Sequence, residues 1–77
     1  MRTDILNDIC AIISELRAKP TTLTENTEPG DVEGWDSLFQ ANLTAALESK
    51  YGIRFKIREI LSWEKVGDII NSIENHQ

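Results

Sequence analysis

Apolar side chains recur at helical spacing in three separate stretches of the chain. The aliphatic residues of the first stretch fall at i, i+4, i+7, i+8 and i+11 and share one helix face: Ile5, Ile9, Ile12, Ile13 and Leu16. Thr3 or Asp4 can begin this helix. Pro20 follows it, and the residue before a proline is pushed away from helical dihedrals. The pattern predicts a first helix from about residue 4 to about residue 18.

The second stretch follows Asp36, whose carboxylate can accept hydrogen bonds from the exposed amides of a first helical turn. Gly52 ends the stretch, because glycine readily adopts the left-handed conformation that follows a last turn. These signals predict a helix over about residues 37–51. Its apolar face contains Phe39, Leu43, Ala46, Leu47 and, one turn later, Tyr51.

Apolar and basic residues alternate over residues 53–58, which taken alone is typical of a half-buried strand. The sequence has no second alternating segment to pair with it, so its backbone hydrogen bonds would be unmet. We therefore expect an extended loop that enters a short helix around residues 58–61. Ser62 can cap a last helix, in which Gly67 suggests close packing. The apolar stripe of this last helix is Val66, Ile69, Ile70 and Ile73.

Residues 20–35 form an unusually long connection that is rich in Thr, Glu, Gly and Pro. Leu23 and Val32 are its only aliphatic anchors, and residues 29–31 carry a Pro-Gly-Asp turn signal. Loops longer than about a dozen residues are often functional. The sequence thus predicts an all-α fold, a small four-helix bundle of three main helices and one short helix, in a single domain over residues 1–77.

Size and composition favour a carrier or binding role over an enzyme. A chain of 77 residues buries roughly 60% of the surface that its unfolded form exposes, which leaves little room for a buried active site. Cys10 is the single cysteine, so an internal disulfide is impossible and a reducing compartment fits best. We expect Cys10 to be a half-buried hydrophobe and His76 to be a disordered tail residue. Without a signal-like or membrane-length apolar run, we expect a cytoplasmic monomer that does not insert into membranes.

The net charge of −5 is unevenly distributed. Residues 20–49 hold six acids and no base, whereas residues 50–66 hold five bases and two acids. The acidic part can attract basic partner surfaces, or it can simply keep the chain soluble. The bases Arg54, Lys56 and Arg58 are too few for a nucleic-acid footprint and lack aromatic stacking partners. A docking surface for an acidic partner patch is the better hypothesis for them.

Ser37 presents a hydroxyl at the start of the second predicted helix, where the sequence supplies no catalytic base. The only histidine is His76, and no lysine or arginine occurs between Lys19 and Lys50. Nothing nearby in the sequence can therefore activate Ser37 as a nucleophile of the chain's own. The position of Ser37 is more typical of an attachment point for another group than of a catalytic residue.

The order of these features along the chain resembles an acyl carrier protein over essentially every residue. The resemblance lies in the Gly-Trp-Asp-Ser-Leu sequence at residues 34–38 between a long acidic loop and a helix, and in the Lys-Val-Gly-Asp-Ile-Ile segment at residues 65–70. It implies that Ser37 receives 4′-phosphopantetheine from coenzyme A, and that the thiol of this arm carries acyl groups as thioesters. A separate phosphopantetheinyl transferase performs the attachment in this family. Asp36 matches the aspartate that helps to position the magnesium ion of the transferase, and Leu38 matches an apolar contact beside the serine.

Some residues depart from the pattern of fatty-acid carriers. Glu48 is the only acid on the second predicted helix, and Trp35 occupies a position where such carriers usually have a small residue. We therefore expect a stand-alone carrier of a specialised pathway, such as polyketide or specialised lipid biosynthesis. Its expected partners, besides the transferase, are an acyltransferase, a ketosynthase or an adenylating ligase.

Several further residues are assigned to partner or cargo contacts. Phe39 is either part of the core or an exposed anchor for a partner, whereas we expect Trp63 to pack and Trp35 to join the loop to the helix. The candidate partner contacts are Trp35, Phe39, Glu48, Arg54 and Arg58, and the last two can also contact the phosphate of the arm. The resemblance also implies that Ala41, Ala45, Ile57 and Ile60 border an acyl-binding space and are candidate acyl or arm contacts, although close helix packing is the simpler interpretation of the small alanines.

Two alternatives remain open from the sequence. The chain can be an aminoacyl or peptidyl carrier that an adenylating ligase loads, or it can be an unmodified helical adaptor that uses the same fold. Identifying the enzyme that loads the holo form would distinguish an aminoacyl or peptidyl carrier from an acyl carrier. Intact mass after treatment with coenzyme A and a transferase distinguishes the second.

Overall fold

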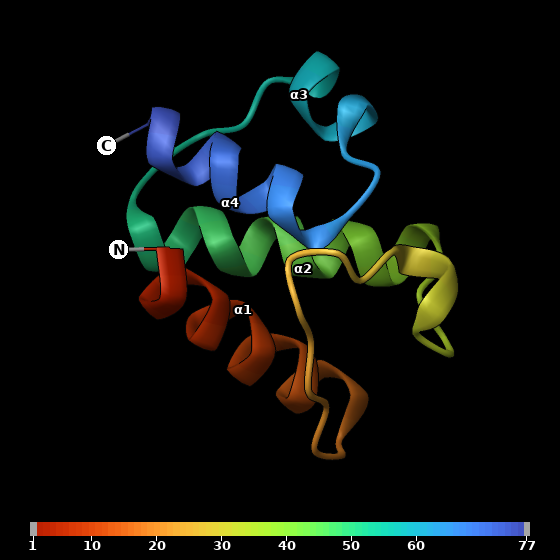
Figure 1. Cartoon of the computed structure of the whole chain (residues 1–77). Helices are drawn as coiled ribbons and strands as arrows, with labels where there is room; N and C mark the ends of the chain where they lie inside the picture. The colour runs from red at the N-terminus through yellow and green to blue at the C-terminus, as the bar shows by residue number, and fades with distance from the viewer. Residues whose placement is uncertain (1, 77) are drawn as a thin grey trace.

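Four α-helices make up most of the chain in the computed structural model, which describes residues 2–76 (Figure 1). No strand occurs within this described range. A 3-10 helix, η1 (Pro29–Asp31), lies in the long connection, at the predicted turn. The expected all-α four-helix fold is therefore confirmed. Its helices are α1 (Arg2–Arg17), α2 (Ser37–Tyr51), α3 (Ile57–Ser62) and α4 (Val66–Asn75).

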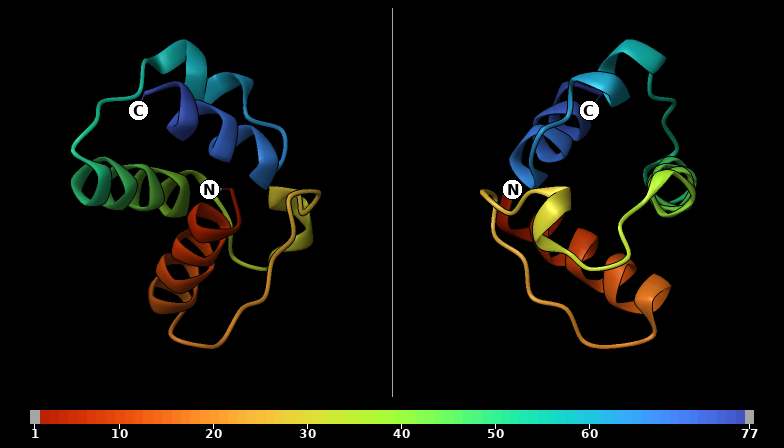
Figure 2. Two further views of the ribbon diagram at one scale, coloured as in Figure 1. Left: turned by 60° about the vertical axis from the view of Figure 1, so that its left-hand side comes forward. Right: turned by 90° about the vertical axis from the view of Figure 1, so that its right-hand side faces the viewer.

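The helices are arranged around α1, which packs against both α2 and α4. α3 packs on the outer side of α4 and lies on the opposite side of the molecule from α1 (Figure 2). The chain between α1 and α2 runs along the outside of the helices and returns to the start of α2 (Figure 1). The long connection thus sets where α2 begins.

The ends of α1 and α2 are fixed by left-handed residues. Ala18 has a φ of 59°, and Gly52 has a φ of 66°. The amide of Lys19 donates to the carbonyl of Ser14 (3.1 Å), and the amide of Ile53 donates to the carbonyl of Glu48 (3.1 Å), which satisfies last-turn carbonyls. The bounds predicted for α2 are confirmed. α1 instead begins earlier than predicted, at Arg2, and ends at Arg17, before Pro20 can act on it.

The core consists of the aliphatic stripes of α1, α2 and α4 together with anchors from the connections. Leu23 and Val32 are buried, as predicted for the long loop. α2 is rotated from its predicted orientation, because Phe39 and Ala46 are only half-buried whereas Thr44 is buried and donates to the carbonyl of Gln40 (2.8 Å). The other buried apolar residues are Ile5, Ile9, Ile13, Leu43, Leu47, Phe55, Val66, Ile69, Ile70 and Ile73.

The start of α4 is docked onto the long loop. The amide of Gly67 donates to the carbonyl of Glu25 (2.8 Å), and the amide of Val66 donates to that of Thr27 (2.9 Å). A Cβ atom at position 67 would lie 3.1 Å from the carbonyl oxygen of Glu25, which is closer than ordinary contact. The close packing expected at Gly67 is therefore confirmed.

Ser62 does not cap the last helix, so that prediction was wrong. Its hydroxyl donates to the carbonyl of Glu59 (2.7 Å) at the end of α3. The carboxylate of Asp68 accepts instead from the amides of Glu64 (2.8 Å) and Lys65 (3.3 Å), the residues before α4. α4 begins at Val66 with Lys65 at the N-cap position, so Ser62 lies three residues before the position that a capping serine would occupy.

The expectation that His76 is a disordered tail residue was also wrong. Its Nε2 atom lies 3.0 Å from Oε1 of Glu59, and its ring meets the ring of Phe55 edge-on with centroids 5.6 Å apart. Trp63 packs as expected, because its ring lies 4.9 Å from that of Phe55 and its Nε1 donates to Ser72 (2.8 Å). These contacts hold α3 against α4.

Candidate functional site

Ser37 is the first residue of α2, and the residues before it fix the direction in which the helix begins. Asp36 has an extended backbone, and its Oδ1 accepts the amide of Phe39 (2.9 Å), which confirms the predicted N-cap. The amide of Asp36 donates to the carbonyl of Gly34 (3.0 Å), where a φ of 88° favours glycine. These local hydrogen bonds set the start of α2, and the Ser37 side chain is exposed at the surface.

The hydroxyl of Ser37 is not prepared for catalysis by the chain itself. It forms no hydrogen bond with any side chain or backbone group of residues 2–76. The amides of Ser37 and Leu38 lie in the first helical turn, where no carbonyl of the helix can accept from them. Together with the helix dipole, these free amides favour an anion at this position. The site can hold a phosphate ester but cannot activate its own serine.

Trp35 joins the loop to α2, as expected. Its Nε1 donates to the side-chain oxygen of Gln40 (2.8 Å), and its ring lies 5.3 Å from that of Phe39. Gln40 was not singled out in the sequence, because an isolated polar residue on a helix carries no signal of such a contact. Phe39 is half-buried, and a contact with a partner protein remains a prediction for it. It packs on the core and also lines a surface hollow of about 340 Å³ with Leu16 and Lys19.

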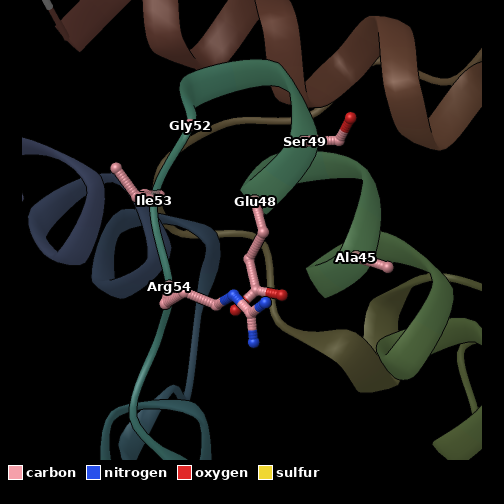
Figure 3. Close-up of a pocket in the computed structure, with 6 residues that line it drawn as sticks. All are labelled: Ala45, Glu48, Ser49, Gly52, Ile53 and Arg54. Atoms are coloured by element: carbon pink, nitrogen blue, oxygen red, sulfur yellow. The ribbon is translucent and has the colours of Figure 1, made fainter.

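Glu48 and Arg54 line one surface groove of about 540 Å³ at the end of α2 (Figure 3). Oε2 of Glu48 accepts the amide of Phe55 (2.9 Å). Ala45 lies on the α2 side of the groove. The sequence did not point to the remaining lining residues, Ser49, Gly52 and Ile53, as surface-groove residues.

The residues predicted to contact an acyl chain or the arm do not line one common cavity. Ala45 lines the groove, but Ala41, Ile57 and Ile60 do not. Ala41 and Ala45 are exposed, Ile57 is 76% exposed, and Ile60 is half-buried against the core. Their role in cargo binding remains a prediction.

The other candidate residues lie at the surface. Leu38 is 70% exposed next to Ser37, and Arg54 and Arg58 are exposed on either side of the start of α3. Cys10 is half-buried, as expected, with its thiol 3.9 Å from the carbonyl of Leu23.

The described residues contain neither a cluster of metal ligands nor a membrane-spanning helix. Residues 2–76 contain no group of three or more His, Cys, Asp or Glu side chains placed to hold a metal ion. In the same range, each helix is too short or too polar to cross a membrane.

Comparison with known proteins gives a match at the level of structure. No family model matches the chain, and no curated protein sequence matches it. Among solved structures, the chain is similar to the holo acyl carrier protein of Geobacter metallireducens, determined by solution NMR. The two share 29% sequence identity with a TM-score of 0.85, over 92% of this chain and 83% of the other. The chain thus has the fold of this acyl carrier protein, and the nearly chain-long similarity supports the resemblance to that family.

Proposed function

We propose that this chain is a carrier protein without catalytic activity of its own, and that Ser37 bears 4′-phosphopantetheine. The bound arm would supply a thiol that holds acyl intermediates as thioesters between enzymes of a biosynthetic pathway. The observation that carries the proposal is the exposed, unpartnered hydroxyl of Ser37 at the first position of α2. The similar solved structure is itself a holo acyl carrier protein.

The residues around Ser37 suit a phosphodiester. The free amides of Ser37 and Leu38 and the positive end of α2 favour the negative charge of the ester. Asp36 uses one carboxylate oxygen for the amide of Phe39, so its second oxygen stays available to a metal ion that a transferase brings. Because the chain offers Ser37 no base, the transferase must remove the proton of the hydroxyl.

The partners follow from this role as further parts of the proposal. A phosphopantetheinyl transferase modifies Ser37, and an acyltransferase, a ketosynthase or an adenylating ligase handles the cargo. The surface of α2 favours a specialised pathway over housekeeping fatty-acid synthesis. Glu48 is the only acid of α2, and it is half-buried while its carboxylate bonds to the amide of Phe55.

Intact-mass measurement tests the proposal. The purified chain is incubated with coenzyme A, magnesium and a promiscuous phosphopantetheinyl transferase. We expect the mass of one phosphopantetheine to be added to the wild type and none to Ser37→Ala. Ser49→Ala is the matched control, because Ser49 is another exposed serine on α2 and should leave the modification unchanged.

Two results would contradict the proposal. One is a wild-type chain that stays unmodified while a known carrier in the same tube is modified, as expected of an unmodified helical adaptor. The other is a mass increase that persists in Ser37→Ala. Once the holo form is available, incubation with an acyl-coenzyme A and an acyltransferase, or with an amino acid, ATP and a ligase, shows which class of enzyme loads it.

A further inference from the structure

The outward side of α3 carries an exposed apolar pair that the fold does not need. Leu61 is 80% exposed and Ile57 is 76% exposed, the highest values among the large apolar side chains of the described residues. They lie four residues apart in a helix and therefore share one face. Single exposed apolar residues are ordinary on protein surfaces, but an adjacent pair on a six-residue helix forms a small apolar patch.

The opposite side of α3 already provides its attachment to the rest of the molecule. Ile60 packs on the core, and Glu59 contacts His76 of α4. Phe55 lies before α3 and Trp63 follows it, and the rings of these two residues contact each other. Since these contacts hold α3, the outward pair has no partner within residues 2–76 that would explain its apolar character.

Unpaired positive charge lies close to this pair in the sequence. Arg54, Lys56 and Arg58 are exposed, and none forms an ion pair with the described residues. Other bases of the chain do find acids, since Arg2 pairs with Glu25 and Lys50 with Asp8. Arg54 and Glu48 line the same groove (Figure 3), but they form no ion pair, and Oε2 of Glu48 accepts the amide of Phe55.

We infer that Arg54, Ile57, Arg58 and Leu61, called the α3 face below, dock a partner protein whose surface has an apolar pocket bordered by carboxylates. The apolar pair would fill the pocket, and the two guanidinium groups would pair with the bordering acids. An apolar surface with unpaired cations on a chain of net charge −5 is complementary to such a surface.

A protein partner fits the α3 face better than a lipid surface does. Two bases and two aliphatic side chains give little membrane affinity, and the net negative charge of the chain opposes binding to anionic lipid. The inference deepens the proposed function, because a carrier must be bound by the enzymes that use it. It adds that the α3 face carries positive charge, whereas the loop beside Ser37 is acidic.

An NMR titration tests the docking face directly. The ¹⁵N-labelled full chain is titrated with a synthetic helical peptide that has leucines along one face and glutamates beside them. A second peptide with lysines in place of the glutamates and vesicles of phosphatidylglycerol are titrated in parallel. We expect the acidic peptide to shift the amides of residues 53–62, and we expect the basic peptide and the vesicles to leave them unchanged.

Variants separate the two parts of the face. Arg54→Glu with Arg58→Glu, and separately Ile57→Ser with Leu61→Ser, should each weaken binding of the acidic peptide by roughly tenfold or more. All four side chains are exposed, so the amide spectrum of each double variant should show an intact fold. Lys19→Glu with Lys65→Glu makes the same charge change at other exposed positions and should leave the affinity unchanged.

The inference is overturned if the peptide shifts residues elsewhere, if the two α3 double variants bind like the wild type, or if the vesicles bind and the peptide does not. These results do not depend on modification of Ser37, which is followed by mass in the same samples. An unmodified Ser37 with intact peptide binding would contradict the proposed function alone. Modification without peptide binding would contradict the docking face alone.

Discussion

Asp36 has a structural role in α2 that can be separated from its charge. Its Oδ1 accepts the amide of Phe39 at 2.9 Å, and that amide has no other acceptor in the first turn. Asp36→Ala should therefore lower the free energy of unfolding by about 1 kcal/mol, the usual cost of losing an N-cap. Urea denaturation followed by circular dichroism measures this loss.

Asp36→Asn serves as the control, because the asparagine side-chain oxygen also accepts at an N-cap but carries no charge. We expect its stability to match the wild type within a few tenths of a kcal/mol. Under the proposed function, its modification by a transferase should still be slower, since the carboxylate available to the metal ion is gone. Equal destabilisation by both substitutions would show that the charge, and not the cap, supports α2.

The caps of α2 could be predicted because their partners lie within a few residues. Asp36 reaches Phe39, and Gly52 needs only its own left-handed backbone. His76 could not be placed in this way, because its partner Glu59 is distant in sequence and meets it only after α3 packs on α4. Ser62 misled the prediction because the N-cap position of α4 falls on Lys65, three residues later, while the Ser62 hydroxyl bonds to the carbonyl of Glu59 in α3.

At the scale of elements, α3 depends on contacts from outside the helix. Six residues are too few for an isolated helix to persist in water. Oε1 of Glu59 accepts the amide of Lys56 (2.9 Å) at the start of the helix, and both carboxylate oxygens lie near Nε2 of His76 (3.0 and 3.2 Å). The backbone bond from Lys56, and secondarily the His76 contact, lower the pKa of Glu59.

A lowered pKa makes the contribution of Glu59 dependent on pH. The ionised carboxylate is favoured in the folded chain, so its stabilisation is present above the pKa of an unfolded glutamate and is lost as the pH falls through the lowered value. Glu59→Gln keeps an acceptor for Lys56 but not the charge. We expect it to reduce stability at pH 7 by less than about 1 kcal/mol, because the carboxylate is near the surface.

Urea denaturation of both proteins at several pH values measures this effect. The difference between wild type and Glu59→Gln should shrink as the pH is lowered from 7 toward 3, where the wild-type carboxyl also becomes neutral. Glu64→Gln removes the same charge from an exposed acid and should show no such trend. A difference that stays constant with pH would contradict a role for the Glu59 charge.

The pattern of apolar residues was a better guide to which helices form than to which helix faces are buried. The alternation at residues 53–58 did not give a strand, because no partner strand exists within residues 2–76. In α2, however, Thr44 turns inward and Phe39 turns partly outward. Thr44 is tolerated in the core because its hydroxyl bonds to the carbonyl of Gln40, a compensation that hydropathy alone does not reveal.

At the scale of the whole molecule, Arg2 ties together segments that are far apart in the sequence. Its guanidinium donates to Glu25 of the long loop and, at 2.6 Å each, to Asn71 and Glu74 of α4. The bond from Arg2 lowers the pKa of Glu25. Because the loop leads to α2, this cluster joins the first and last helices to the segment that delivers Ser37.

Arg2→Gln should lower the urea midpoint, and the loss should become smaller in about 1 M salt because exposed ion pairs are screened. It should also become smaller as the pH falls through the lowered pKa of Glu25, since the stabilisation from an ionised carboxylate exists only above that pKa. Arg2→Lys should restore only part of the midpoint, because one ammonium group cannot reproduce several guanidinium bonds in fixed directions.

Arg54→Gln provides the comparison that decides whether Arg2 acts through its contacts or through net charge alone. Both substitutions remove one positive charge from the same acidic chain, but Arg54 forms no ion pair with the described residues. If the contacts matter, Arg2→Gln lowers the midpoint and Arg54→Gln leaves it nearly unchanged. If repulsion among the acids dominates, the two variants lose equal stability, and the ties from Arg2 to Glu25 and α4 do not stabilise the fold.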